Sequence, residues 1–140
     1  MGTWLAVSSI GNRAKQEWWC FPSSAQIGDL VFIYQKGRGV YRVERVISSP
    51  MIKDLRCSTA GLLTASTMLV KEYANTVDFR SIRSDKVLSR MKGVSRSFQG
   101  TTFEVGKGEQ RRLIELLKSA NTPKNLGNAS VKSGRTIKRV

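Results

Sequence analysis

A run of five apolar or aromatic residues, from Leu30 to Tyr34, constrains the fold of this chain most. The run follows the turn signal Gly28-Asp29 and is typical of a strand that is covered on both faces. Residues 40–47 come after a glycine-containing loop and alternate in part between apolar and charged positions. They predict an antiparallel partner strand with one face toward water.

Shorter runs of the same kind predict the remaining elements. Strands are expected at residues 3–7, 67–73, 77–82 and 101–105, and helices at residues 84–92 and 109–119. Ser84 is the expected N-cap of the first helix. Short strands joined by loops with Gly and Pro predict an α+β fold. In that fold five or six strands form a strongly curved mixed sheet or small barrel, surrounded by short helices.

Basic residues outnumber acidic residues in this chain. Its 140 residues hold 24 Lys and Arg against 10 Asp and Glu, a formal net charge of +14. We expect one domain over residues 1–120 and a flexible basic tail over residues 121–140, which contain no acidic residue. A charge surplus of this size favours a polyanionic partner, nucleic acid first and an anionic membrane second.

The residue types that are missing or rare exclude several kinds of site. The chain has no histidine, so catalytic triads and zinc sites that depend on histidine are impossible. Cys20 and Cys57 are too few for a multi-cysteine metal site and do not look like a disulfide framework, which favours a reducing cytoplasm. The longest largely apolar stretch, residues 61–70, is half the length of a membrane span. We therefore expect a cytoplasmic protein with no metal, no cofactor and no membrane partner.

The densest aromatic cluster is Trp18-Trp19-Cys20-Phe21-Pro22, which lies in a predicted loop. A strand would send the two neighbouring indole rings to opposite faces, so we expect at least one ring to be partly exposed or to line a cavity. An exposed indole ring offers a stacking surface for a nucleobase, worth about 1–3 kcal/mol per base. In the alternative interpretation both rings pack beneath the loop as a lid on the sheet.

The ends of the first two predicted strands carry polar side chains. Ser8 and Ser9 follow the first strand, where their hydroxyl groups either read a base edge or cap a turn. Tyr34 ends the second strand and is either a core residue or a residue that faces a ligand. These positions are candidates for a binding site as well as for ordinary structural roles.

The loop at residues 94–103 combines an arginine, an aromatic ring and an amide. Gln99 suits a base edge, because an amide both donates and accepts hydrogen bonds, and Arg96 suits a phosphate. Phe98 lies between them. The alternative is a structural turn before the last strand, in which Gly100 supplies an unusual backbone conformation.

The order of these motifs resembles the EVE domain, a member of the PUA-like superfamily that also holds the YTH and ASCH domains. The resemblance covers residues 3–119 and rests on a Trp-led first strand, the tryptophan-containing loop, Gly28–Tyr34 with its partner Val40–Pro50, and Ser97–Phe103 before a closing helix. It implies a curved, barrel-like mixed sheet with a pocket for one modified or flipped base, walled by aromatic rings, beside a basic groove. The loop at residues 17–22 lacks the Trp-x-Gly-x-Arg-Asn element that EVE domains often show.

The resemblance also implies which positions form the pocket and the groove. The pocket positions are polar or aromatic residues near strand ends, namely Ser8, Ser9, Trp18 or Trp19, Tyr34, Phe98 and Gln99. The phosphate positions are basic residues in neighbouring loops, namely Arg13, Lys15, Arg38 and Arg96. Unstacking a base costs a few kcal/mol, which aromatic stacking offsets. A methyl mark adds only about 0.8 kcal/mol of apolar burial, so discrimination also needs a hydrogen bond.

The leading hypothesis is a non-catalytic module that binds DNA or RNA and reads a modified base. One alternative is a small enzyme of the ASCH type, such as a ribonuclease or a nucleoside amidohydrolase, which needs a placed lysine, threonine or carboxylate. Lys53 with Asp54, or Glu44, are the candidates for that chemistry. A third hypothesis is a general RNA-binding or protein-interaction module that binds through its basic tail.

Overall fold

The structure is a computed structural model that describes residues 2–8 and 17–123. These residues form strands, α-helices and two short 3-10 turns. Their bounds are β1 (Thr3–Ser8), β2 (Trp18–Phe21), β3 (Leu30–Gln35), β4 (Gly39–Val46), α1 (Leu55–Thr59), β5 (Leu63–Val77), α2 (Phe79–Ser84), the 3-10 turns Leu88–Arg90 and Val94–Arg96, β6 (Thr102–Glu104) and α3 (Lys107–Asn121).

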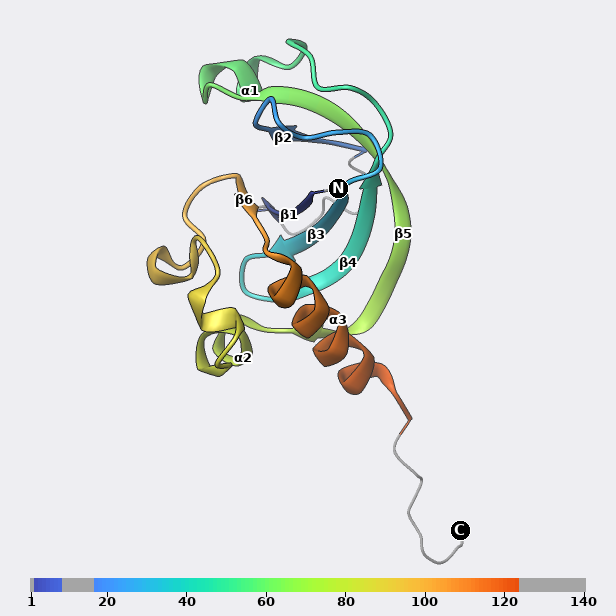
Figure 1. Cartoon of the computed structure of the whole chain (residues 1–140), viewed down its shortest axis with the longest axis vertical. Coiled ribbons are helices and arrows are strands. Elements are labelled where there is room, and N and C mark those ends of the chain that lie inside the picture. Colours follow the sequence, from blue (N-terminus) through green and yellow to red (C-terminus); the bar gives the residue numbers. More distant parts are fainter. Residues whose placement is uncertain (1, 9–16, 124–140) are drawn as a thin grey trace, which may run out of the picture.

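All strands of the described residues belong to one sheet with the order β2-β5-β4-β3-β1-β6. β1 and β3 are parallel, and the other neighbouring strands are antiparallel. The sheet curls into a nearly closed barrel with α3 across its outer side (Figure 1). The Thr102 hydroxyl donates a hydrogen bond to the Cys20 carbonyl, which joins β6 to β2, the two ends of the sheet. The predicted α+β class and PUA-like architecture are confirmed.

β5 is one strand of 15 residues, where the sequence predicts two strands at residues 67–73 and 77–82. The second of these predictions is wrong because a helix begins there. The Asp78 carboxylate accepts a hydrogen bond from the Ser81 N–H at 2.8 Å and so caps α2. The pairing of β5 with β4 contains two irregularities, which increase the local bend and twist. The beginning of β5 can therefore pair with β2 while the rest pairs with β4.

The predicted helix at residues 84–92 is also wrong. Ser84 ends α2 and does not cap a following helix. The carboxylate of Asp85 instead accepts the N–H of Leu88 at 3.1 Å. The chain then makes a single 3-10 turn at Leu88–Arg90. The predicted strand at 101–105 and the closing helix are confirmed as β6 and α3.

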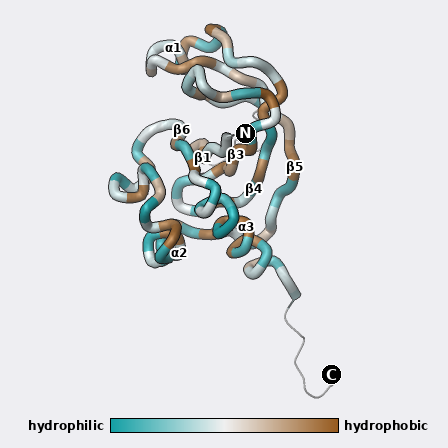
Figure 2. The backbone as a smooth tube through the Cα atoms, in the orientation of Figure 1, coloured by the Kyte–Doolittle hydropathy of each residue, from teal (hydrophilic) through white to brown (hydrophobic). Residues whose placement is uncertain are grey.

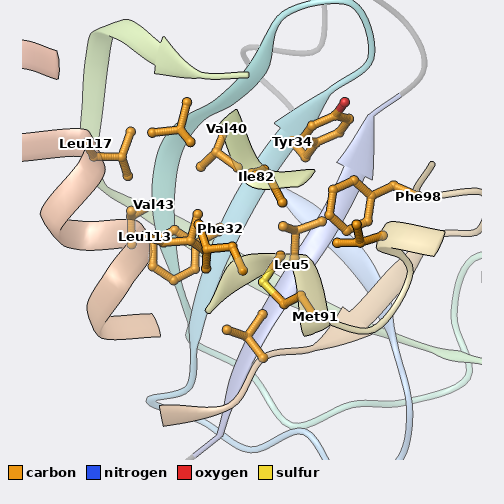
Figure 3. Close-up of a cluster of buried hydrophobic side chains, with 14 of the residues drawn as sticks. Leu5, Phe32, Tyr34, Val40, Val43, Ile82, Met91, Phe98, Leu113 and Leu117 are labelled. Carbon is orange, nitrogen blue, oxygen red and sulfur yellow. The ribbon is translucent and has the colours of Figure 1, made fainter. Parts of the chain in front are cut away.

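The sheet separates two hydrophobic clusters. The inner cluster lies on the concave side and consists of Trp4, Ala6, Trp19, Phe21, Ala25, Val31, Ile33, Tyr41, Val46 and Ala65. The outer cluster lies between the sheet and the helices, and α3 contributes Leu113 and Leu117 to it (Figure 3). α3 is therefore amphipathic: its hydrophobic residues lie on the side that packs on the barrel, and hydrophilic residues lie between them along the chain (Figure 2).

Cys20 of β2 and Cys57 of α1 form a disulfide bond, with their Cα atoms 5.1 Å apart. The structure thus corrects the prediction that the two cysteines are not a disulfide pair. Thirty-seven positions separate them, and the sequence predicts a loop where β2 places Cys20 beside α1. The bond fastens α1 to β2 at the end of the barrel.

The side chain of Asn121 is one of the groups that join the end of α3 to β5. The Asn121 side chain accepts the Asn75 N–H and donates to the Asn75 carbonyl, both at 2.8 Å. Residues 124–140 of the predicted tail lie outside the described residues, so the boundary at residue 120 stays a prediction. Within the described residues, no helix is long and apolar enough to cross a membrane.

Candidate functional site

The two adjacent tryptophans lie on opposite faces of β2. Trp18 pairs with Ser66 of β5, and Trp19 pairs with Ala65. Trp19 belongs to the inner cluster and is only 6% exposed, whereas Trp18 is half-buried on the opposite face. The expectation that a strand separates the two rings is confirmed, although the sequence predicts a loop here. The interpretation in which both rings are buried under a loop does not hold.

Trp19 is held by a buried polar network inside the barrel. Its indole N–H donates to Oε1 of Glu44 at 2.8 Å, and the Thr67 hydroxyl donates to the same oxygen at 2.6 Å. The other carboxylate oxygen lies 2.9 Å from Nε of Arg42. The Glu44 side chain is only 2% exposed, so these contacts satisfy a carboxylate that is otherwise costly to bury. The network fixes Trp19 as part of the barrel wall.

The network reaches the surface through a second carboxylate. Arg42, whose side chain is 9% exposed, also lies 3.4 Å from Oε1 of Glu72, which is 51% exposed. Oε1 of Glu44 therefore accepts two hydrogen bonds and Oε2 lies in the ion pair with Arg42, which does not suit a general base. A general base must offer an oxygen to the proton that it removes.

Trp18 lines a pocket of about 250 Å³ on the outer side of β2. The pocket wall also contains an ammonium group, a carboxylate and two hydroxyl groups, which belong to Lys53, Asp54, Thr64 and Ser66. Hydroxyl groups donate and accept, the ammonium group donates, and the carboxylate accepts. The pocket therefore combines an aromatic ring with every type of polar group that a small, planar, hydrogen-bonding ring requires.

Arg56 of α1 stacks on Trp18, with its guanidinium carbon 4.6 Å from the ring centroid. The same side chain lies 3.1 Å from the Asp54 carboxylate. Hydrogen bonds from the Arg56 side chain and backbone hold the pKa of Asp54 below its usual value. Asp54 is therefore a charged acceptor at neutral pH. The Cys20–Cys57 bond fixes α1, and with it Arg56, beside β2.

Ser8 lies at the end of β1 and is buried. It pairs with Gln35 in the parallel ladder, on the same face of β1 as Ala6 of the inner cluster. Ser9, Arg13 and Lys15, which the sequence analysis also selects, lie outside the described residues.

Arg38 lies in the loop before β4 and is exposed. Its guanidinium carbon is 4.3 Å from the ring centroid of Tyr41, and one of its N–H groups lies 3.4 Å from Oε1 of Gln35. Tyr41 belongs to the same inner cluster as Trp19. Arg38 thus lies at the rim of the barrel, with its cationic end accessible.

Tyr34 and Phe98 belong to the outer cluster and are not brought to Trp18. Their ring centroids lie 4.8 Å apart, and both rings are buried between the sheet and the segment after α2 (Figure 3). Burial, with a contribution from Asp78, raises the pKa of Tyr34 above its usual value. Gln99 and Arg96 flank Phe98 and are exposed. The structure therefore divides the predicted site between the two faces of the sheet.

Trp18 is predicted from the sequence, but most of the pocket around it is not. Lys53 and Asp54 are predicted only as candidates for catalysis, and no sequence pattern points to Arg56. Arg56 reaches Trp18 because the disulfide holds α1 beside β2, and the cysteines carry no visible signal of that pairing. The described residues contain no group of histidine, cysteine and carboxylate side chains that could hold a metal ion.

The comparisons with known proteins identify the fold. No protein-family model matches the chain, and a search of curated proteins finds no match. An NMR structure of a protein from Rhodopseudomonas palustris matches with a TM-score of 0.66 and 14% identity, covering 85% of this chain and 94% of that chain. A crystal structure of a protein from Agrobacterium tumefaciens matches with a TM-score of 0.66 and 16% identity, covering 89% and 98%.

One structural neighbour contains a nucleic acid. The human THYN1 protein, an EVE domain protein, was crystallised in complex with DNA that contains 5-methylcytosine. It matches with a TM-score of 0.66 and 11% identity, covering 84% of this chain and 98% of that chain. The chain thus has the fold of the EVE domain, as the resemblance of the sequence implies.

Proposed function

We propose that this protein binds a nucleic acid and accommodates one base, preferably a modified one, in the pocket beside Trp18. The observation that carries the proposal is the half-buried indole ring of Trp18, which lines a pocket of about 250 Å³ together with hydroxyl, carboxylate and ammonium groups. Small-molecule pockets of about 300–1,000 Å³ suit drug-sized ligands. A pocket below that range suits a smaller, planar ligand such as a single nucleobase.

The cost of extruding a base and the gain from stacking it on Trp18 are of similar size. Extruding a base from its stack costs a few kcal/mol, and stacking on Trp18 returns about 1–3 kcal/mol. The hydroxyl groups of Thr64 and Ser66 and the carboxylate of Asp54 supply hydrogen bonds that select among bases. A methyl group on the base adds about 0.8 kcal/mol when it is buried. A preference for a modified base therefore needs both the apolar ring and the polar wall.

The other selected residues take supporting parts in this proposal. Trp19, fixed by Glu44, positions β2, and Tyr34 and Phe98 stabilise the segment that presents Gln99 and Arg96. The exposed side chains of Arg38 and Arg96 suit phosphates, as do Arg13 and Lys15 by their charge.

Two independent facts support a nucleic acid as the partner. The chain carries a net charge of +14, and such a field attracts polyanions. The human THYN1 structure, which has the same fold, contains DNA with 5-methylcytosine. The Cys20–Cys57 bond removes the argument from unpaired cysteines on which the expected cytoplasmic location rested.

The test is a binding screen with short single- and double-stranded oligonucleotides that carry plain or modified bases. Trp18→Ala should weaken binding of the preferred modified oligonucleotide by about tenfold or more, the equivalent of about 1.4 kcal/mol of lost stacking. Trp18→Phe, which keeps an aromatic ring, is the matched control and should retain most of the affinity. Equal affinity of wild type and Trp18→Ala for every oligonucleotide would remove this pocket from the binding site.

A catalytic role for the same pocket is the second candidate, because Lys53 and Asp54 both line it. The Asp54 carboxylate already accepts the Arg56 N–H at 2.9 Å and pairs with the guanidinium group, which weakens it as a base. Turnover of an N-acylated nucleoside or cleavage of RNA that Lys53→Gln abolishes would favour an enzyme. Binding without turnover favours a module that only reads its ligand.

A further inference from the structure

The segment from α2 to the second 3-10 turn carries an unusual density of positive charge. Residues 79–96 contain six arginine or lysine residues and one acidic residue, Asp85. This segment forms a lobe at the side of the barrel, coloured yellow to gold in Figure 1. It lies between the barrel and solvent, and every one of its cationic side chains is exposed.

The acidic residue of the lobe is already neutralised from within the protein. Nε of Arg112 on α3 lies 2.8 Å from Oδ1 of Asp85. Burial raises the pKa of Asp85, but the hydrogen bonds from the Leu88 N–H and from Arg112 outweigh it and hold that pKa below its usual value. Asp85 is therefore a structural anion that neutralises none of the cations of the lobe itself.

Two of the six cations have carboxylates nearby. Lys92 lies 3.0 Å from the Glu104 carboxylate, and Arg80 lies close enough to Asp78 to lower the pKa of that carboxyl. The other four form no ion pair with any carboxylate of residues 2–8 and 17–123. We call these four residues the basic strip: Arg83, Lys86, Arg90 and Arg96.

The backbone beneath the basic strip is fixed by buried side chains that alternate with the cations. Ile82, Leu88, Met91, Val94 and Phe98 are all buried in the outer cluster. Each of these anchors lies one or two residues from a cation of the strip, so the core holds the backbone on which the exposed cations lie. Ordering the strip therefore costs little backbone entropy on binding.

A hollow lies within the strip. It has a volume of about 410 Å³, and its wall contains Lys86 and Arg90 together with Gly106 and Gly108. The only carboxylate that lines it is that of Glu109. That carboxylate accepts a hydrogen bond from the Gly106 N–H at 2.8 Å. Lys86 and Arg90 outnumber it, so the wall of the hollow carries a net positive charge.

We infer that the basic strip binds the phosphate backbone of a nucleic acid, with a phosphate group in the hollow between Lys86 and Arg90. The inference rests on the proposed function and adds a second contact region to it. The strip supplies affinity that does not depend on sequence, whereas the pocket at Trp18 supplies the preference for a base. The partner is a nucleic acid rather than a phospholipid surface, because α3, the amphipathic helix that adjoins the lobe, packs its apolar residues Leu113 and Leu117 on the barrel and does not offer them to a membrane interface.

The test compares two double variants of the full chain that each remove two positive charges. Lys86→Gln/Arg90→Gln alters the strip, and Lys71→Gln/Lys118→Gln alters exposed residues of β5 and α3. Binding to a 20-base-pair DNA is measured as a function of salt. A plot of log K against log salt has a negative slope. In the strip variant this slope should become shallower by about 1.8, that is, by about 0.9 for each lost phosphate contact. The control variant should keep the slope of wild type, and base preference should be unchanged in both.

Each outcome has a distinct meaning. Equal slopes for the two double variants would overturn the strip, because net charge alone would then explain binding. If wild type binds vesicles with anionic phospholipid more strongly than DNA, and Lys86→Gln/Arg90→Gln loses that vesicle binding, the strip binds a membrane and the inference is overturned. A strip variant that behaves like the control while Trp18→Ala loses base preference would refute the strip and leave the proposed function intact. Absence of nucleic-acid binding by wild type would refute the proposed function itself.

Discussion

Removing the Glu44 carboxylate should destabilise the barrel more than removal of any exposed carboxylate. In Glu44→Ala, Arg42 loses its nearest anion inside the barrel, and the Trp19 N–H and the Thr67 hydroxyl lose their acceptor. Breaking a buried ion pair by removing one partner costs about 3–5 kcal/mol. A domain of this size is stable by about 5–15 kcal/mol, so the variant should lose a large part of its stability.

Two further variants separate charge from hydrogen bonding. Glu72→Gln removes the other anion near Arg42, but that carboxylate is half exposed, so the loss should stay below about 1 kcal/mol. Glu44→Gln keeps an amide oxygen for the Trp19 N–H, but it loses the charge and places an NH2 group where Oε2 faces Arg42. We expect its stability to lie between those of Glu72→Gln and Glu44→Ala.

The free energy of unfolding is measured by urea titration, with tryptophan fluorescence as the signal. The midpoints should shift while the m-values stay equal, because equal m-values show that the variants change stability and not the denatured state. If Glu44→Ala and Glu72→Gln unfold within about 0.5 kcal/mol of each other, the buried network does not hold the barrel together, and Trp19 must be fixed by packing alone.

Three other predictions follow from the geometry. Replacing Cys20 and Cys57 by serine opens a loop of 37 positions and should lower the free energy of unfolding by about 4 kcal/mol, measured by urea titration; a loss below about 1 kcal/mol would contradict this. Gly39→Ala should destabilise the protein far more than Gly37→Ala. An added Cβ at Gly39 would lie 2.4 Å from the carbonyl oxygen of residue 77, whereas an added Cβ at Gly37 would meet open space. Equal melting temperatures of the two variants would contradict this prediction. Folding lowers the pKa of Asp85 from its usual value of 3.8. The ionised carboxylate therefore stabilises the protein above about pH 4, and this stabilisation is lost as the pH falls through the pKa of the folded state. In Asp85→Asn the melting temperature should fall less steeply with acid than in wild type, and an unchanged pH profile would refute this prediction.

The central strands could be predicted from the sequence because their side chains are buried on both faces. The run from Leu30 to Tyr34 is apolar throughout, and the structure explains why: its residues alternate between the inner and the outer cluster. The same argument holds for β1, where Leu5 faces the outer cluster and Ala6 the inner one. Patterns of this kind report burial, and burial is what defines these strands.

β2 and α2 could not be predicted because other interactions decide them. β2 is only four residues long, and its pairing with the start of β5 is a long-range contact that no local pattern records. α2 begins where Asp78 caps it, although the flanking residues Val77, Phe79 and Ile82 read as part of a strand. Local capping thus prevails over the apolar pattern.

The candidate site was predicted in part for the same reasons. The separation of Trp18 and Trp19 follows from strand geometry alone. It predicts that at least one ring is accessible, but it does not say which one. The positions of Tyr34 and Phe98 on the other face depend on the path of the chain after α2, which the sequence does not specify. Arg56 depends on the pairing of Cys20 with Cys57, and two cysteines far apart in the sequence carry no information about their distance in space.

The position of β1 between β3 and β6 sets the order in which this protein can acquire its native state. In the finished sheet Trp4 lies opposite Glu104, 100 residues later in the chain. During synthesis β1 can meet β3 early, but its other edge stays open until nearly the whole domain has been translated. Contacts between such distant residues slow folding. A nascent chain released before β6 would therefore expose the unpaired edge of β1 and should be held by chaperones or aggregate.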